Sequence, residues 1–283
     1  MKYSKIFASS ALVLFALAAK PSIAQQQVLF KIKFSPNKTY TMEMTNDMKM
    51  EMDLPDSAMR SSVMAKGMKL PMHLDMLQEM SITTRTGAGA ADGRIPVTIS
   101  YDKVGTSVKM EGKEMKKPDN LAGMKIKGHV AKDGKLSVDE IEGNIAPEMK
   151  KSIENTVSQM LKSVNFPDKA MKIGDTFSQE MPMVIPTAAG TMSLVVKANY
   201  VLKEIKAKQA FFDYTQDISM DFKVDQGKST ASGSGAGRMI YDIPTNYITE
   251  TTGDMKLDMT VAVGEMVMKI NANGKTLAKS GVL

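Results

Sequence analysis

The sequence predicts a mainly β protein: a curved antiparallel sheet, a pair of sheets or a half-barrel, packed on one central helix. Three observations carry this prediction: long stretches in which apolar and polar residues alternate, turn-forming residues between them, and one stretch of helical periodicity. The clearest stretch is Thr39–Leu54, where polar and charged residues fill the odd positions. Since successive strand side chains point to opposite faces, its even positions form a methionine face, made of Met42, Met44, Met48, Met50 and Met52.

The first 24 residues predict a signal peptide. Lys2 and Lys5 precede an apolar run over Ile6–Ala19, too short for a membrane anchor, and Ser22-Ile23-Ala24 offers the small residues that a signal peptidase reads. We expect cleavage after Ala24, export to the periplasm or the cell exterior, and no transmembrane segment in the mature chain. An uncleaved membrane helix is the alternative.

The charge of the mature chain argues against nucleic-acid binding. Removing Lys2, Lys5 and Lys20 from 37 basic residues leaves 34 against 31 acidic ones. Lysines and acids alternate along the predicted strands, which indicates a solvated surface. Tryptophan is absent and aromatic residues are 6% of the chain, so stacking platforms for bases are not expected.

The chain begins with two predicted strands and an ambiguous segment. Val28, Phe30, Ile32 and Phe34 share one parity and predict a strand over Gln25–Asn37. The methionine strand follows it. The next residues carry methionines four apart, as in a helix, but a glycine and a proline interrupt the pattern, so we expect short helical turns or a mobile flap; these residues are Ser57–Met80, with Met64, Met68, Met72, Met76 and Met80, and the interruptions are Gly67 and Pro71.

A meander of short strands comes next. The residues of 87–93 form one turn, Val104-Gly105 lies near a second, and Asp133-Gly134 is a strong hairpin signal. The strands expected around these turns are Met80–Thr86, Arg94–Lys103, Gly105–Met115, Gly123–Lys132 and Lys135–Ile141.

One amphipathic helix is expected over Pro147–Val164. Asn144 is a candidate N-cap, and a first-turn proline is tolerated. The apolar stripe at helical spacing consists of Met149, Ile153, Val157, Met160, Leu161 and Val164.

Strands return after the helix. Gly227–Gly237 is expected to be a flexible connection, and Pro244-Thr245-Asn246 a turn. The strands expected are Met192–Leu202, Phe212–Val224, Arg238–Ile243, Tyr247–Thr252, Met255–Val263 and one through Met266–Ile270. Similar patterns at Thr39–Met44 and Thr176–Met181 suggest a duplicated β-meander, with a signal peptide (1–24), an N-terminal half (25–143), a connecting helix (144–167) and a C-terminal half (168–283).

Three segments carry a resemblance to known proteins. NKTYTMEM (37–44), IGDTFSQEMP (173–182) and GRMIYDIPTNYITETTGDM (237–255) are similar to segments of an uncharacterised family of exported bacterial β-rich proteins. The resemblance implies export and a β-rich fold, because no activity is established for the family. The curved sheet with a helix also resembles, in architecture alone, periplasmic lipoprotein carriers.

The residue types argue against an enzyme. Without cysteine the chain has no disulfide, thiolate metal site or cysteine nucleophile, and His73 and His129 are its only histidines. No nucleophile-elbow motif occurs, and no Lys-Ser/Thr pair follows the glycines of 232–237. We expect no cofactor.

Methionine is the unusual residue, with 27 in the chain and 11 of them between Met42 and Met80. Flexible thioethers adapt to varied apolar partners, so Met42, Met44, Met48, Met50 and Met52 are the candidate lining of a site for a hydrophobic or lipid-like ligand. Two alternatives remain: a structural or interaction protein of the cell envelope with this face as ordinary core, and Cu(I) or Ag(I) binding by Met-x-Met pairs.

Overall fold

The computed structural model describes residues 26–115, 122–132, 134–143, 164–187, 190–224, 227–263 and 266–283. Within these ranges one short helix, α1 (Ser57–Ala65), accompanies the strands. The strands are β1 (Thr39–Asp53), β2 (Met72–Thr86), β3 (Ile95–Met110), β4 (Lys113–Met115), β5 (Lys125–Val130), β6 (Leu136–Glu142), β7 (Thr176–Thr187), β8 (Gly190–Lys206), β9 (Gln209–Val224), β10 (Gly227–Asp242), β11 (Tyr247–Val263) and β12 (Met266–Val282).

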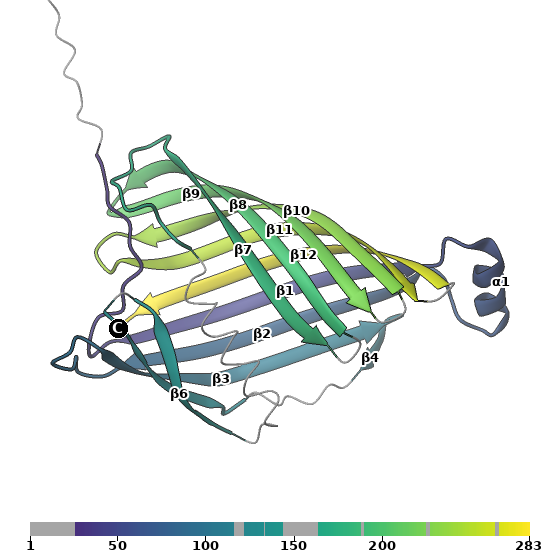
Figure 1. Cartoon of the computed structure of the whole chain (residues 1–283), viewed down its shortest axis with the longest axis horizontal. Coiled ribbons are helices and arrows are strands. Elements are labelled where there is room, and N and C mark those ends of the chain that lie inside the picture. Colours follow the sequence, from purple (N-terminus) through teal and green to yellow (C-terminus); the bar gives the residue numbers. More distant parts are fainter. Residues whose placement is uncertain are drawn as a thin grey trace, which may run out of the picture.

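All the strands belong to one 12-stranded antiparallel sheet. The order is β6-β5-β3-β2-β1-β12-β11-β10-β9-β8-β7, with β4 paired to β3. The C-terminal strand β12 therefore joins the two meanders at the middle of the sheet, where it pairs with β1. The predicted mainly β, curved antiparallel architecture is confirmed, as one open sheet that bends into a trough (Figure 1).

The two faces of the sheet differ in polarity. The strand β2 shows this difference, because Met76 is half-buried and Met80 buried, while Asp75 and Glu79, the residue before each of them, are exposed. The convex face carries ion pairs such as Lys103–Glu79, with Nζ 2.9 Å from Oε2. These exposed pairs stabilise the fold little, so burial of the concave face is the main source of stability.

The segment 26–38 crosses one end of the trough instead of adding a strand. The predicted strand over Gln25–Asn37 is therefore wrong: a single bridge joins Val28 to Met171. The alternating apolar residues are still used, since Phe30 packs on Phe212 and Phe34 packs on Tyr40. The alternation of apolar residues in this segment therefore reflects side chains that pack against residues of the strands. The helix α1 lies at the opposite end of the molecule (Figure 1).

Two hydrophobic cores lie on either side of the trough near the segment 26–38. The first is built on β1–β3, β5 and β6, and the second on β7–β10. Phe30 is 1% exposed at the centre of the second, with ring centroids 5.1 Å from both Phe212 and Tyr241. This segment therefore fastens both halves of the sheet.

The methionines of Ser57–Met80 divide between two elements. Met64 lies in α1 and Met68 just after it, both about half exposed, whereas Met72, Met76 and Met80 lie on β2. A spacing of four is two strand repeats as well as about one helical turn, so the pattern fits both periods. The helical turns are confirmed at Ser57–Ala65.

The turn predicted near Val104-Gly105 and the separation of the predicted strands Tyr247–Thr252 and Met255–Val263 are both wrong. β3 continues through Val104-Gly105, and its turn comes at Glu111-Gly112, where both residues have positive φ. β11 is one strand over Tyr247–Val263 and includes Gly253. Neither glycine adopts a turn conformation.

The predicted flexible connection Gly227–Gly237 is also wrong. These residues are the first part of β10 and pair with both β9 and β11. The predicted strands within β8 and β9 are confirmed, and the chain turns between them at Ala207 and Lys208, which have positive φ.

Two other predictions fall outside the described residues. They are the signal peptide, residues 1–24, and nearly all of the predicted helix at 147–164. Val164, its last residue, is described and belongs to no helix or strand.

Candidate ligand site on the concave face

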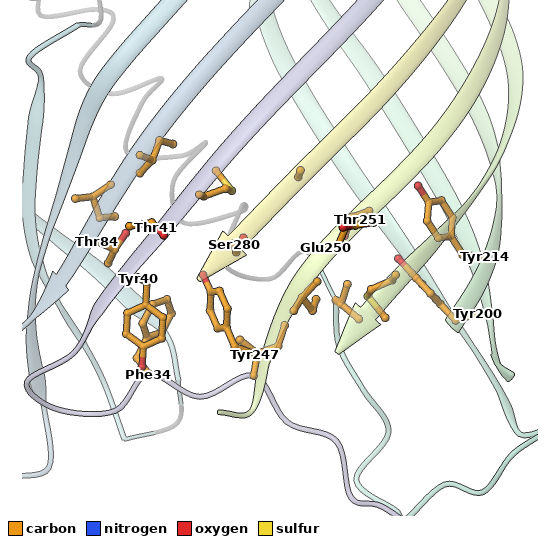
Figure 2. Close-up of a pocket in the computed structure, with 18 of the residues that line it drawn as sticks. Phe34, Tyr40, Thr41, Thr84, Tyr200, Tyr214, Tyr247, Glu250, Thr251 and Ser280 are labelled. Carbon is orange, nitrogen blue, oxygen red and sulfur yellow. The ribbon is translucent and has the colours of Figure 1, made fainter. Parts of the chain in front are cut away.

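A pocket of about 360 Å³ lies in the trough near the segment 26–38. We call it the end pocket (Figure 2). Strands far apart in the sheet order, such as β3 and β8, contribute to it, because the sheet curls around it. The lining residues are Ile32, Phe34, Tyr40, Thr41, Met42, Ile82, Thr84, Ile99, Tyr101, Val164, Tyr200, Tyr214, Gln216, Met239, Tyr247, Ile248, Glu250, Thr251, Ala278 and Ser280.

The end pocket is mostly aromatic and aliphatic. Burial, with a smaller contribution from Tyr214, raises the pKa of Tyr200 to about 12, and burial together with Tyr40 raises the pKa of Tyr247 to about 12. These phenols are therefore neutral at physiological pH. The Tyr40 hydroxyl accepts a hydrogen bond from the Ser35 amide at 2.7 Å, which ties the segment 26–38 to β1.

The five methionines proposed from the sequence all lie on β1, and all are half-buried. Met42 lines the end pocket, and Met44 packs against the first hydrophobic core. Met48, Met50 and Met52 continue along the same face of β1, away from the pocket. The structure thus brings one of the five to the pocket and places three beyond it.

The methionine face extends across neighbouring strands. Its register pairs Met48 with Met76 and Met52 with Met72 on β2. On the other side of β1 come small and aliphatic residues of β12 and then residues of β11. We call this surface the methionine wall; it consists of Met48, Met50, Met52, Met72, Leu74, Met76, Ile270, Ala272, Met255, Leu257 and Met259.

Glycines on β10 and β11 let side chains lie flat against the trough. A Cβ on Gly237 would lie 2.6 Å from the Tyr214 hydroxyl, and a Cβ on Gly235 would lie 2.6 Å from the Gln216 amide nitrogen. A strand glycine commonly marks such a close approach. No signal in the sequence identified Tyr214 and Gln216 as lining residues, because their partners are distant in the chain.

Histidines and carboxylates do not gather at one point in the part of the chain that the structure describes. No group of three His, Asp or Glu side chains gathers there to hold a metal ion. His129 lies 3.1 Å from Asp139, measured from Nδ1 to Oδ2, and neither histidine lines the end pocket. Among the helices of the described residues, none is long and apolar enough to cross a membrane.

No protein-family model matches the sequence, and no curated protein matches it. Among solved structures, the chain is similar to lipovitellin, in a structure that concerns lipid–protein interactions, with a TM-score of 0.42 and 11% identity. That alignment covers 89% of this chain and 26% of lipovitellin, so the chain spans about a quarter of its length. OccK7 (OpdD) of Pseudomonas aeruginosa aligns with a TM-score of 0.24 and 6% identity, over 87% of this chain and 100% of that one.

OpdQ of Pseudomonas aeruginosa aligns more weakly, with a TM-score of 0.21 and 7% identity over 88% of this chain and 99% of that chain. These similarities assign no family. The resemblance to an uncharacterised exported family and to lipoprotein carriers stays an expectation from the sequence.

Proposed function

We propose that the protein is an exported, non-enzymatic binding protein that holds a hydrophobic or lipid-like ligand in its trough. The observation that carries this proposal is the end pocket, which opens onto a face whose methionines are half-buried. A face that served only as core would be expected to bury them fully. Flexible thioethers suit a ligand of variable shape.

The size and chemistry of the end pocket support such a ligand. Its volume of about 360 Å³ is within the range of small-molecule sites, and such sites are predominantly apolar with a few polar groups. Each ligand CH₂ removed from water contributes about 0.8 kcal/mol. An acyl chain of about ten such groups would gain roughly 8 kcal/mol before the entropic cost of binding.

Export fits this proposal. The signal peptide expected at residues 1–24 would deliver the protein to a compartment in which a lipid needs a carrier through water. The non-enzymatic part of the proposal rests on the sequence, which has no cysteine and only His73 and His129 as candidate imidazole bases.

Binding of a non-polar fluorescent probe tests the proposal. The probe should gain fluorescence in the presence of the protein and lose it when phospholipid or free fatty acid is added. A probe that stays dark, with the protein folded, would contradict the proposal and favour a structural or interaction protein whose methionine face is core.

Binding of Cu(I) or Ag(I) is a second candidate, supported by the register of β1 and β2. Met44 faces Met80, Met48 faces Met76 and Met52 faces Met72, so soft thioether pairs meet across two strands. Titration with Ag(I) distinguishes this function: stoichiometric binding that disappears when Met42, Met44, Met48, Met50 and Met52 are replaced by Leu would support it, and unchanged or absent binding would exclude it.

A further inference from the structure

One polar residue interrupts the methionine series of β1. The even positions from Met42 to Met52 are all methionine except Asn46. Asn46 therefore lies on the concave face, half-buried, with Met44 and Met48 on either side of it. A polar group in such a position normally has a structural or binding role.

Polar residues lie in register with Asn46 on both neighbouring strands. Asn46 pairs with Gln78 of β2 and Thr276 of β12. The Thr276 hydroxyl donates to the Asn46 side-chain oxygen at 2.9 Å, and the Asn46 amide donates to the Gln78 side-chain oxygen at 3.4 Å. We call these three residues the polar band.

The polar band divides the concave face into two apolar regions. On one side β1 continues to Met42 and Tyr40 in the end pocket, and on the other it continues to Met48 and Met52 in the methionine wall. At about 3.3 Å per residue, the six positions from Asn46 to Tyr40 and the six to Met52 each span roughly 20 Å. A long apolar chain could therefore lie on either side of the band.

The hydrogen bonds leave donors unused. An amide nitrogen carries two hydrogens, and among the described residues Gln78 Nε2 donates to no protein group, while Asn46 Nδ2 donates once. The Asn46 oxygen already accepts from Thr276. The band therefore presents amide N–H groups to the trough, which suit an oxygen acceptor.

The charges next to the band face the other way. Asp47, Glu79 and Lys275 adjoin the three band residues in sequence, all are exposed, and alternation puts them on the convex face. An ionised carboxylate or ammonium group at the band would meet no opposite charge from these strands.

We propose that Asn46, Gln78 and Thr276 bind the polar group of a neutral lipid, through an uncharged ester or amide carbonyl that accepts hydrogen bonds from the Gln78 and Asn46 amides. The apolar parts of this lipid lie in the end pocket and along the methionine wall. This inference rests on the proposed function and names the ligand class for the same trough.

The test compares a long-chain wax ester with an n-alkane of the same length, both delivered from cyclodextrin, by displacement of the non-polar probe. The native protein should bind the ester about tenfold more tightly than the alkane, as one hydrogen bond from an amide would give. In the double variant Asn46→Met, Gln78→Met the two affinities should be equal, with alkane binding kept.

The matched control is Asn271→Met, Asn273→Met, two exposed positions on the opposite face of β12, which should keep the preference for ester. If this double variant fails to fold, Asn46→Leu, Gln78→Leu makes the same test, because it also removes both amides. The assignment of the band would be overturned if the band variant kept the preference for the ester. It would also be overturned if the native protein bound the ester and the alkane equally well. A native protein that binds neither would overturn the proposed function itself.

Discussion

The Tyr214 hydroxyl lies over Gly253, so that a Cβ added to Gly253 would be 2.3 Å from the hydroxyl oxygen. The same hydroxyl donates to the Thr252 carbonyl oxygen at 3.1 Å. The ring of Tyr214 on β9 thus reaches over β10, where a Cβ on Gly237 would meet it too, to β11. Two glycines on adjacent strands therefore make room for one tyrosine in the wall of the end pocket.

Gly253→Ala should destabilise the protein by about 2 kcal/mol, the usual cost of overpacking. Chemical denaturation measures this change. Gly105→Ala on β3 is the control, because a Cβ there would have no atom within 4 Å, and its free energy of unfolding should not fall.

The Tyr214→Phe variant tests whether the Tyr214 hydroxyl causes the destabilisation by Gly253→Ala. Removing the hydroxyl should cost about 1 kcal/mol by itself, since it loses the hydrogen bond to Thr252. Gly253→Ala should then be much less harmful, because the ring carbon Cζ lies at 3.4 Å, within ordinary contact. A double-mutant cycle with no coupling energy would refute the overlap.

Ala278→Phe should block ligand binding. Ala278 lines the end pocket and is half-buried, so a phenyl ring would fill part of the 360 Å³ volume. Leu277→Phe, at the adjacent position on the opposite face, is the matched control and should leave probe binding unchanged. Titration of the probe measures both, and equal loss in the two variants would place the bound molecule elsewhere.

Phe30→Ala should destabilise the protein by about 3 kcal/mol or more, because the ring is 1% exposed and packs on Phe166, Phe212 and Tyr241. Leu29→Ala should change stability by less than about 0.5 kcal/mol, since Leu29 is 47% exposed. Thermal unfolding of both variants tests whether the segment 26–38 holds the two halves together. Equal melting temperatures would contradict that role.

Alkaline pH should destabilise the fold. The pKa values of Tyr200 and Tyr247 are raised to about 12 in the folded protein, mainly by burial, against 10.0 for an ordinary tyrosine. The unfolded chain therefore releases protons first, so the stability that these neutral phenols contribute is complete below about pH 10 and is lost as the pH rises toward about 12.

Unfolding with denaturant across this pH range measures the loss. Tyr247→Phe should make the alkaline decline shallower, because one titrating group is gone, and should cost little at neutral pH since no described group bonds the Tyr247 hydroxyl. A decline of the same steepness in this variant would show that other groups cause it.

The alternating pattern of residues was enough to predict the sheet and its methionine face. The pattern could not distinguish a helix from a strand where the spacing fits both. Met72, Met76 and Met80 are such a case, and only the pairing of β2 with β1 decides between them. The sequence likewise predicted a flexible linker at the glycines of β10. No neighbouring residue indicates that Gln216 would cover Gly235 or that Tyr214 would cover Gly237.

The candidate site was predictable only along its own strand. Met42 was identified from parity on β1, whereas Tyr200, Tyr214 and Met239 reach the same pocket through the curvature of the sheet. The one local clue that was missed is Asn46, which breaks the methionine series and lies in register with Gln78 and Thr276.

Native mass spectrometry of the protein, purified without detergent, shows directly whether the trough holds a ligand. We expect a complex heavier than the polypeptide alone, which releases an extractable neutral lipid on denaturation and exchanges it for lipid from added vesicles. A single unliganded mass, unchanged after incubation with those vesicles, would contradict the claim that the trough is a binding site.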